Sequence, residues 1–148
     1  MWSRRELLTV MGGVATATWL NAPSYAQQIV QIERGSPDRH VILDVVRASV
    51  QRRLGIKVIF RVERLAVFGD WAFAGLHPRT ASGTRIDYRR TLYAKNYIPD
   101  LDSDSVDVLL RRDGAVWSIV EEAFLPTDVV WEEWQKKYKL PRALFLVE

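Results

Sequence analysis

The sequence of 148 residues contains no cysteine and only two histidines, His40 and His77. Without cysteine the chain forms no disulfide bond and offers no thiolate to zinc, to an iron–sulfur cluster or to a covalently attached haem. Two histidines are also too few for a multi-histidine metal site. We therefore predict that the chain binds no metal ion and no cofactor, and any catalysis would have to proceed without a cysteine nucleophile.

The chain also lacks a hydrophobic run long enough to span a membrane. Residues 7–20 form a stretch of 14 uncharged residues, whereas a spanning helix needs about 20 apolar residues. Arg4 and Arg5 precede this stretch, and Ser24 and Ala26 follow it with the small-residue spacing that a signal peptidase accepts. This order predicts a signal peptide that is cleaved after Ala26, so that no stable membrane span remains in the mature protein.

The leader, residues 1–26, resembles a twin-arginine translocation signal, whose family pattern is Ser/Thr-Arg-Arg-x-Phe-Leu-Lys. The residues that carry the resemblance are Ser3, Arg4, Arg5, Leu7 in the place of phenylalanine, and Leu8. Thr9 replaces the lysine of the pattern. The resemblance implies that the protein folds before export to the periplasm or the medium. Two alternatives stay open, a general secretory signal that happens to contain two arginines and an uncleaved helical anchor.

Cleavage of the leader leaves residues 27–148, which is the size of one small domain. The whole chain has 21 basic and 18 acidic residues and a net charge of +3. This excess is far below the concentrated basic surface of a nucleic-acid-binding protein. We predict a single exported domain that does not bind nucleic acid, and the sequence gives no indication of its oligomeric state.

The mature sequence opens with the signals of a long helix. Ser36 is a suitable N-cap, Pro37 suits the first helical position, and Gly55 is suited to end the helix. Apolar residues recur between them at spacings of three and four, which predicts one apolar helix face. These residues are Val41, Ile42, Val45, Val46, Val50 and Leu54.

Two hairpins are predicted after this helix. Apolar and polar residues alternate over 56–62, and a slip of the alternation near Arg64 predicts a β-bulge. Gly69 and Asp70 then favour a tight turn into a returning strand over 71–76. The first hairpin is therefore expected to contain a bulged strand.

The second hairpin is predicted around the Asp-Gly pair at 113–114. Counting outward from this turn pairs Leu110 with Trp117 and Val108 with Ile119, all on one face. The residues predicted to face the opposite way are Asp107, Arg111, Ser118 and Glu122.

A third strand is predicted over 85–93, because Ile86, Tyr88 and Leu92 share one phase. A short final helix is predicted to start at Thr127 and Asp128 and to end before Pro141. The predicted fold is thus α+β, an antiparallel sheet with one long N-terminal helix packed on it and a short C-terminal helix. This element order is similar to cystatin-like folds and to nuclear-transport-factor-like domains. The similarity is one of architecture and implies no activity.

Two patterns that can carry chemistry are not supported by their spacing. Residues 100–104 alternate aspartates as a calcium-binding loop does, but Ser105 and Arg111 stand where that loop needs glycine and glutamate. His77 and Asp70 are the only nearby acid–base pair, and the predicted strand between them holds them about 20 Å apart. We predict no catalytic residue, and interpret His77 as a surface residue that ends a strand.

Residues 79–97 are unusually rich in arginine and tyrosine, which suit an anionic ligand. The candidate binding residues are Arg79, Arg85, Tyr88 and Arg89, together with Trp71 from the first hairpin. The acidic stretch 100–107 follows immediately, and we expect it to neutralise these arginines within the domain.

Phe68, Trp71 and Phe73 share one phase at the tip of the first hairpin. They either form an outward-facing binding patch or are covered by the final helix, which carries Trp131 and Trp134. We expect the helix to cover them.

These observations predict an exported binding or accessory protein without a catalytic centre, which acts with a periplasmic protein partner. The alternative is a periplasmic small-anion-binding protein or an enzyme that uses residues 79–97. A deep, closed cavity lined by Arg85 or Arg89 favours this alternative. A filled core in which these arginines pair with Asp102, Asp104 or Asp107 opposes it.

The twin-arginine resemblance predicts the outcome of replacing Arg4 and Arg5 by lysine. Because this route reads the two guanidinium groups rather than their charge alone, we expect export of the variant to stop. The measurement compares the amounts of processed protein in periplasmic and cytoplasmic fractions. Unimpaired export would instead indicate a general secretory signal.

Overall fold

The computed structural model describes residues 28–146, so the predicted signal peptide lies outside the described residues. Within them five strands form one antiparallel sheet in the order β1-β2-β3-β4-β5. The strands are β1 (Ile29–Gln31), β2 (Val58–Phe68), β3 (Trp71–Thr80), β4 (Val106–Asp113) and β5 (Val116–Phe124). Two α-helices and this antiparallel sheet make the domain α+β, as predicted.

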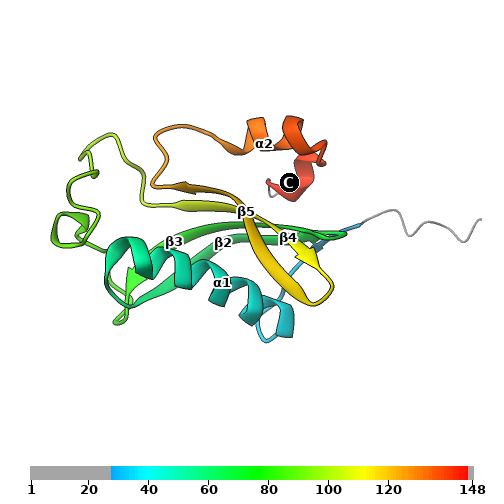
Figure 1. Cartoon of the computed structure of the whole chain (residues 1–148), viewed down its shortest axis with the longest axis horizontal. Helices are drawn as coiled ribbons and strands as arrows, with labels where there is room; N and C mark the ends of the chain where they lie inside the picture. Colours follow the sequence, from blue (N-terminus) through cyan, green and yellow to red (C-terminus); the bar gives the residue numbers. More distant parts are fainter. Residues whose placement is uncertain (1–27, 147–148) are drawn as a thin grey trace, which may run out of the picture.

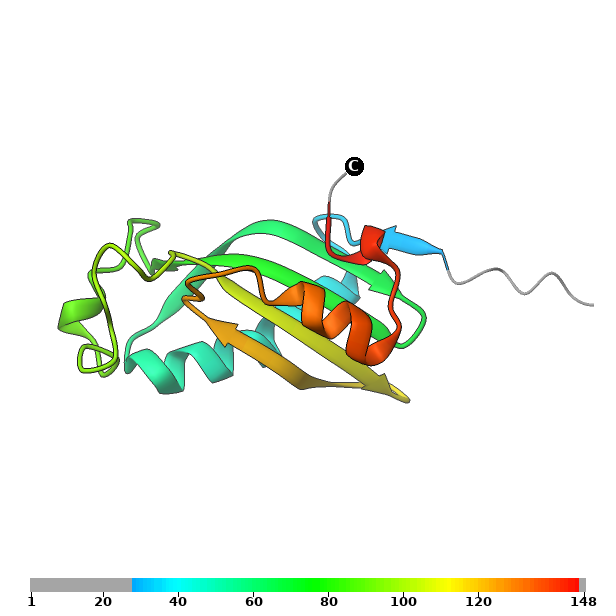
Figure 2. The same cartoon turned by 90° about the horizontal axis from the view of Figure 1, so that it is seen from above.

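The domain has three layers. The helix α1 (Pro37–Leu54) lies against one face of the sheet, and α2 (Trp131–Tyr138) lies over the other face with the C-terminal segment (Figures 1 and 2). That segment contains the short 3₁₀ helix η2 (Arg142–Leu144). No helix among residues 28–146 combines the length and the apolar character needed to cross a membrane.

The larger core lies between α1 and the sheet. Ser36 occupies the N-cap position of α1 without a capping hydrogen bond from its side chain, and Gly55 ends the helix with a left-handed φ of 70°. The buried residues of α1 include Ile42, Val46, Val50 and Leu54, and they pack on Leu65, Leu76, Val108, Leu110 and Trp117 of the sheet.

Strand β2 contains the predicted β-bulge. Val62 pairs with Leu76, but the next pair is Arg64 with Gly75, so that Glu63 is the extra residue. Side chains of β2 therefore change their alternation at this point. Leu65 returns to the α1 core, whereas Arg64 turns toward the face covered by α2.

The predicted register of the second hairpin is wrong by two residues. Asp113 pairs with Val116, so the turn is formed by residues 114–115, and Leu110 pairs with Ile119 rather than with Trp117. Because side chains alternate with a period of two, this shift leaves them on the predicted face.

A second bulge lies in β5 and corrects the prediction for Glu122. The register shifts near Leu109 and Leu110, and Val120 has no partner on β4. The alternation changes there, so Glu122 faces α1, where Ser49 Oγ donates a hydrogen bond of 2.8 Å to its carboxylate.

The third strand predicted over 85–93 is absent from the structure. Arg85 makes a single bridge to Arg79, and the chain then forms the 3₁₀ helix η1 (Tyr88–Arg90). The Asp87 side chain accepts a hydrogen bond from the Arg89 N–H, which stabilises this turn instead of an extended strand. Leu92 is 73% exposed and does not share a face with buried Tyr88.

The aromatic residues of the first hairpin are covered, as predicted. The Phe73 ring lies 5.0 Å from the Phe145 ring, and Trp71 lies 4.9 Å from Tyr138. Buried residues of this second core include Trp134, Leu140 and Leu144. The helix that supplies the cover begins at Trp131 rather than near Asp128.

Replacing Leu144 by alanine tests the second core. Leu144 is fully buried, so we expect the free energy of unfolding to fall by about 2–5 kcal/mol. The matched control is Leu101→Ala at a position that is 63% exposed, where the change should stay within about 0.5 kcal/mol. Chemical denaturation measures both, and equal effects would contradict the packing of the C-terminal segment.

Candidate functional site

Arg79 and Tyr88, two of the predicted binding residues, are bound to one carboxylate within the domain. Arg79 Nη1 lies 2.7 Å from Asp104 Oδ2, and the Tyr88 hydroxyl donates a 3.0 Å hydrogen bond to Asp104 Oδ1. Burial, followed by the neighbouring Asp104 charge, raises the pKa of Tyr88. Asp104 thus neutralises Arg79 in the way expected for the acidic stretch.

Arg85 and Arg89 lie on the outside of the same segment. They line an open hollow of about 410 Å³ with Tyr88 and Tyr97, and Arg79 is not part of it. Arg89 Nε lies 3.0 Å from Asp87 Oδ1, and this hydrogen bond lowers the pKa of Asp87 and raises that of Arg89. One of the two arginines of the hollow is therefore already paired, but with Asp87 rather than with the acidic stretch 100–107 as predicted.

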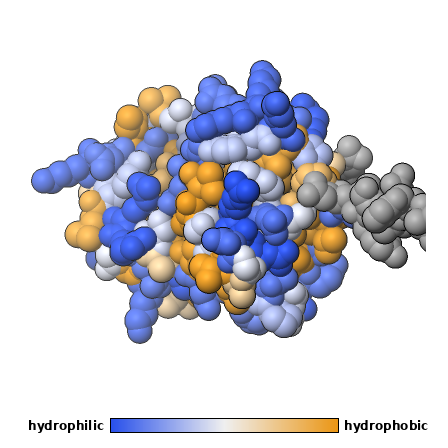
Figure 3. Space-filling model, turned by 45° about the vertical axis from the view of Figure 1, so that its right-hand side comes forward, coloured by the Kyte–Doolittle hydropathy of each residue, from blue (hydrophilic) through white to orange (hydrophobic). Residues whose placement is uncertain are grey.

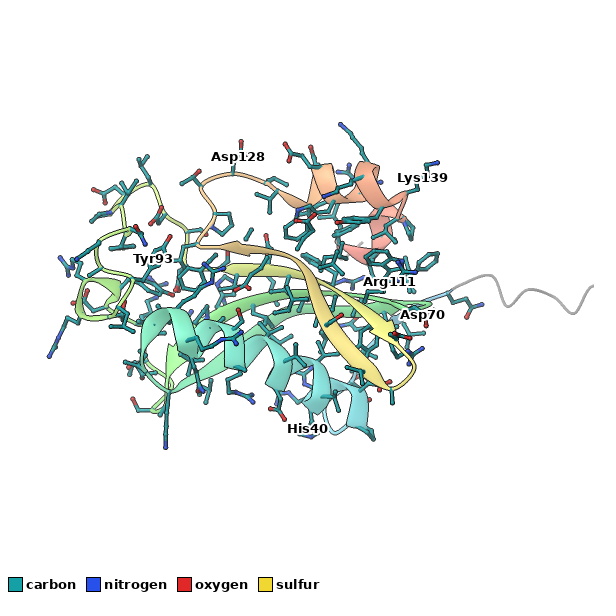
Figure 4. The ribbon with its side chains drawn as sticks, in the orientation of Figure 1. His40, Asp70, Tyr93, Arg111, Asp128 and Lys139 are labelled. Atoms are coloured by element: carbon teal, nitrogen blue, oxygen red, sulfur yellow. The ribbon has the colours of Figure 1, made fainter. Side chains whose placement is uncertain are left out.

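Trp71 lies far from these residues. The Arg111 guanidinium stands 5.2 Å from the Trp71 ring, and Arg111 lies with Asp70 at one end of the sheet (Figure 4). Tyr93, which follows the arginine-rich turn, lies at the opposite end in the same view. The predicted binding residues consequently do not form one site.

A cleft that was not predicted lies on the face covered by α2. It has a volume of about 420 Å³, and strands β2, β3 and β4 form its floor with Glu63, Gly75, His77 and Asp107. Aromatic and apolar side chains form its walls. These are Phe73, Trp131, Phe145 and Leu146.

His77 is held by two hydrogen bonds in this cleft. Its Nδ1 lies 2.7 Å from the backbone carbonyl oxygen of Asp104, and its Nε2 lies 2.7 Å from Glu63 Oε2. A carbonyl oxygen only accepts, so Nδ1 donates, and the second hydrogen bond needs another proton between Nε2 and the Glu63 carboxylate. His77 is thus an interior residue of β3 paired with Glu63, which corrects its interpretation as the end of a strand.

Asp107 is the partly exposed carboxylate on the floor of the cleft. It is half-buried, and its carboxylate makes no hydrogen bond to another of residues 28–146. The pKa of Asp107 is raised to about 6, first by burial and second by the Glu63 charge, while His77 acts in the opposite direction. A carboxyl group with a raised pKa in an apolar-walled cleft is a typical functional-site candidate.

Gly75 and Arg64 give the cleft its shape. Gly75 pairs with Arg64 on one side and Asp107 on the other, and its missing side chain leaves space between them. The Arg64 guanidinium donates to the backbone oxygens of Ala143 at 2.6 Å and Leu144 at 3.3 Å, which fixes the C-terminal segment over the sheet. Burial lowers the pKa of Arg64.

Sequence reasoning missed this cleft because the bulge combines residues of different predicted phases. Glu63 and His77 lie 14 positions apart in the sequence. They come onto the same face of the sheet only because the bulge shifts the side-chain alternation of β2. Two signals pointed toward it, the slip of alternation at Arg64 and a glycine within a predicted strand, which often marks a ligand or a close approach.

The other acidic clusters have internal partners. Two of the aspartates of 100–104 are held locally, since Asp102 accepts the Ile98 N–H at 2.9 Å and Asp104 binds Arg79. Among residues 28–146 no three acidic or histidine side chains come together as a metal-binding group.

One face of the molecule shows small hydrophobic areas separated by hydrophilic side chains (Figure 3).

A scan for protein families finds no match, and neither curated proteins nor solved structures give a significant match to this chain.

The raised pKa of Asp107 predicts how its replacement by asparagine changes stability with pH. The ordinary pKa is 3.8 and the folded-state pKa is about 6. Between these values the folded protein binds more protons than the unfolded chain, so Asp107 makes the free energy of unfolding fall as the pH rises through this window. Asparagine does not ionise, so the free energy of unfolding of the variant lacks this fall with pH.

We therefore expect Asp107→Asn to gain stability relative to the native protein between pH 4 and pH 7, as followed by chemical denaturation at several pH values. Asp113→Asn, at the exposed end of the same strand, is the matched control. A stability difference that does not change with pH would contradict a raised pKa at Asp107.

Proposed function

We propose that this protein is an exported, non-catalytic binding protein whose ligand occupies the cleft formed by Glu63, His77 and Asp107. The observation that carries the proposal is the half-buried Asp107 carboxylate without a hydrogen-bond partner among residues 28–146. Burying an unpaired charge is costly, and a ligand that pairs with it recovers that cost. Export is supported by the leader with Arg4 and Arg5, and the destination is the periplasm or the medium.

The cleft suits a small organic cation with an apolar body. An ammonium group supplies both the positive charge and the N–H donors that Asp107 lacks. Phe73, Trp131 and Phe145 line the cleft and would contact the apolar part. Glu63 Oε2 already lies 2.7 Å from His77 Nε2, so Asp107, which has no such contact, is the group proposed to select the charge of the ligand.

The alternative of an anion site within residues 79–97 receives less support. Both Arg79 and Arg89 are paired with aspartates, and the hollow beside Arg85 is open. The long helix on an antiparallel sheet supports an architectural similarity to cystatin-like and nuclear-transport-factor-like domains, from which no activity follows.

Binding of benzylamine tests the proposal, with benzyl alcohol and benzoate as ligands of similar shape and different charge. At pH 7.5 we expect benzylamine to bind in the roughly millimolar range that a fragment of this size reaches. Benzoate should not bind, because its charge repels Asp107. Chemical-shift changes in NMR spectra would follow the titrations and locate the ligand.

Two variants test separately how the charge of the cleft and the free space on its floor contribute to binding. Asp107→Asn removes the charge, and we expect benzylamine binding to weaken about tenfold or more. Gly75→Val keeps every charge and places methyl groups on the floor, where an added Cβ would lie 3.5 Å from Arg64 Cβ and 3.7 Å from Asp107 Oδ1. Benzylamine binding that survives both substitutions, or equal binding of all three ligands, would refute the proposed site.

A further inference from the structure

One edge of the sheet lacks a neighbouring strand along half of its length. Strand β1 pairs only with residues 66–68 of β2 (Figure 2). Within residues 28–146 no strand pairs with β2 on that side between Val58 and Glu63. Free strand edges are templates for pairing with another chain.

The backbone groups of Phe60 and Val62 point to this free edge. The Val58 N–H donates to the Gln51 side chain at 3.1 Å, so it points away from β3. Alternate residues of a strand present their backbone groups to the same side. Phe60 therefore has the same orientation, and its partner on β3 is Pro78, which has no N–H to offer.

Phe60 and Val62 thus leave two N–H and two C=O groups for a further strand. The backbone hydrogen bonds formed outside the sheet ladders among residues 28–146 include none from either residue. The opposite edge of the sheet differs, because β5 is interrupted there by the bulge at Val120. Bulges hinder edge pairing, and the bulge of β2 lies at Glu63, at the end of the free stretch, so residues 58–62 remain a regular template.

A groove of about 550 Å³ runs beside this edge. It lies between β2 and the connection between β1 and α1, and His40 of α1, labelled in Figure 4, is among the residues that line it. Arg34, Arg39 and Arg61 line it, against the acids Glu33 and Glu63. Three arginines against two glutamates leave the groove with a surplus of positive charge.

We infer that the free edge of β2 binds an extended acidic segment of a partner protein by β-strand addition. Backbone hydrogen bonds to Phe60 and Val62 supply the pairing, and the arginines of the groove select acidic side chains at alternate positions. A second copy of this chain fits less well, because antiparallel pairing of two β2 edges brings both copies of Arg61 together. This inference does not depend on the ligand proposed for the cleft.

The test uses the folded protein and three synthetic peptides. The first is a capped hexapeptide of alternating glutamate and valine, the second replaces glutamate by lysine, and the third is the first with N-methyl groups on alternate backbone amides. Hydrogen exchange followed by NMR reports on the Phe60 and Val62 amides. We expect the acidic peptide to slow their exchange about tenfold or more, and the other two peptides to have no effect.

Arg61→Glu should weaken binding of the acidic peptide about tenfold, whereas Arg90→Glu, a charge reversal on an exposed residue outside the groove, should leave it unchanged. Equal binding of the N-methylated peptide would show simple charge attraction and overturn strand addition. Unchanged exchange at Phe60 and Val62 would overturn the site. Protection of these amides by protein concentration alone would indicate a second copy instead of an acidic partner.

Discussion

The extra residue in β2, Glu63, determines which side chains of this strand lie on each face of the sheet. Before Glu63, alternate residues such as Val62 face α1, and after it Leu65 takes the same role. The bulge thereby keeps both halves of an 11-residue strand attached to the α1 core. It also directs two consecutive polar residues, Glu63 and Arg64, to the face below α2, where one holds His77 and the other holds the C-terminal segment.

The cleft follows from this arrangement. Arg64 fixes the aromatic C-terminal segment over the sheet, Gly75 leaves the floor open, and Asp107 on the next strand lies under the resulting roof. The Glu63 charge discourages ionisation of Asp107, while the cleft gives it no partner of its own. Glu63 lines both this cleft and the groove at the free edge, so the bulge joins the two surfaces on which a ligand and a partner are proposed to bind.

Local patterns predicted much of the fold, because they depend on neighbouring residues. The bulge near Arg64, the turn at Gly69 and the cover over Phe73 all follow from alternation and turn chemistry. The turn over 85–93 was missed because hydrogen bonds from Arg89 to the Asp87 carboxylate outweigh the apolar alternation of this segment. The cleft was missed because Asp107 meets Glu63 and His77 only through the register of three strands, which sequence spacing does not specify.

The most direct measurement is the titration of the Asp107 carboxyl carbon by ¹³C NMR in the folded protein. Asp107 should titrate with a midpoint of about 6, well above its ordinary 3.8. The midpoint should fall in Glu63→Gln, because that variant removes the neighbouring negative charge. A midpoint near 3.8 in the native protein would mean that Asp107 is solvated like any surface carboxylate, and it would contradict the proposed binding cleft.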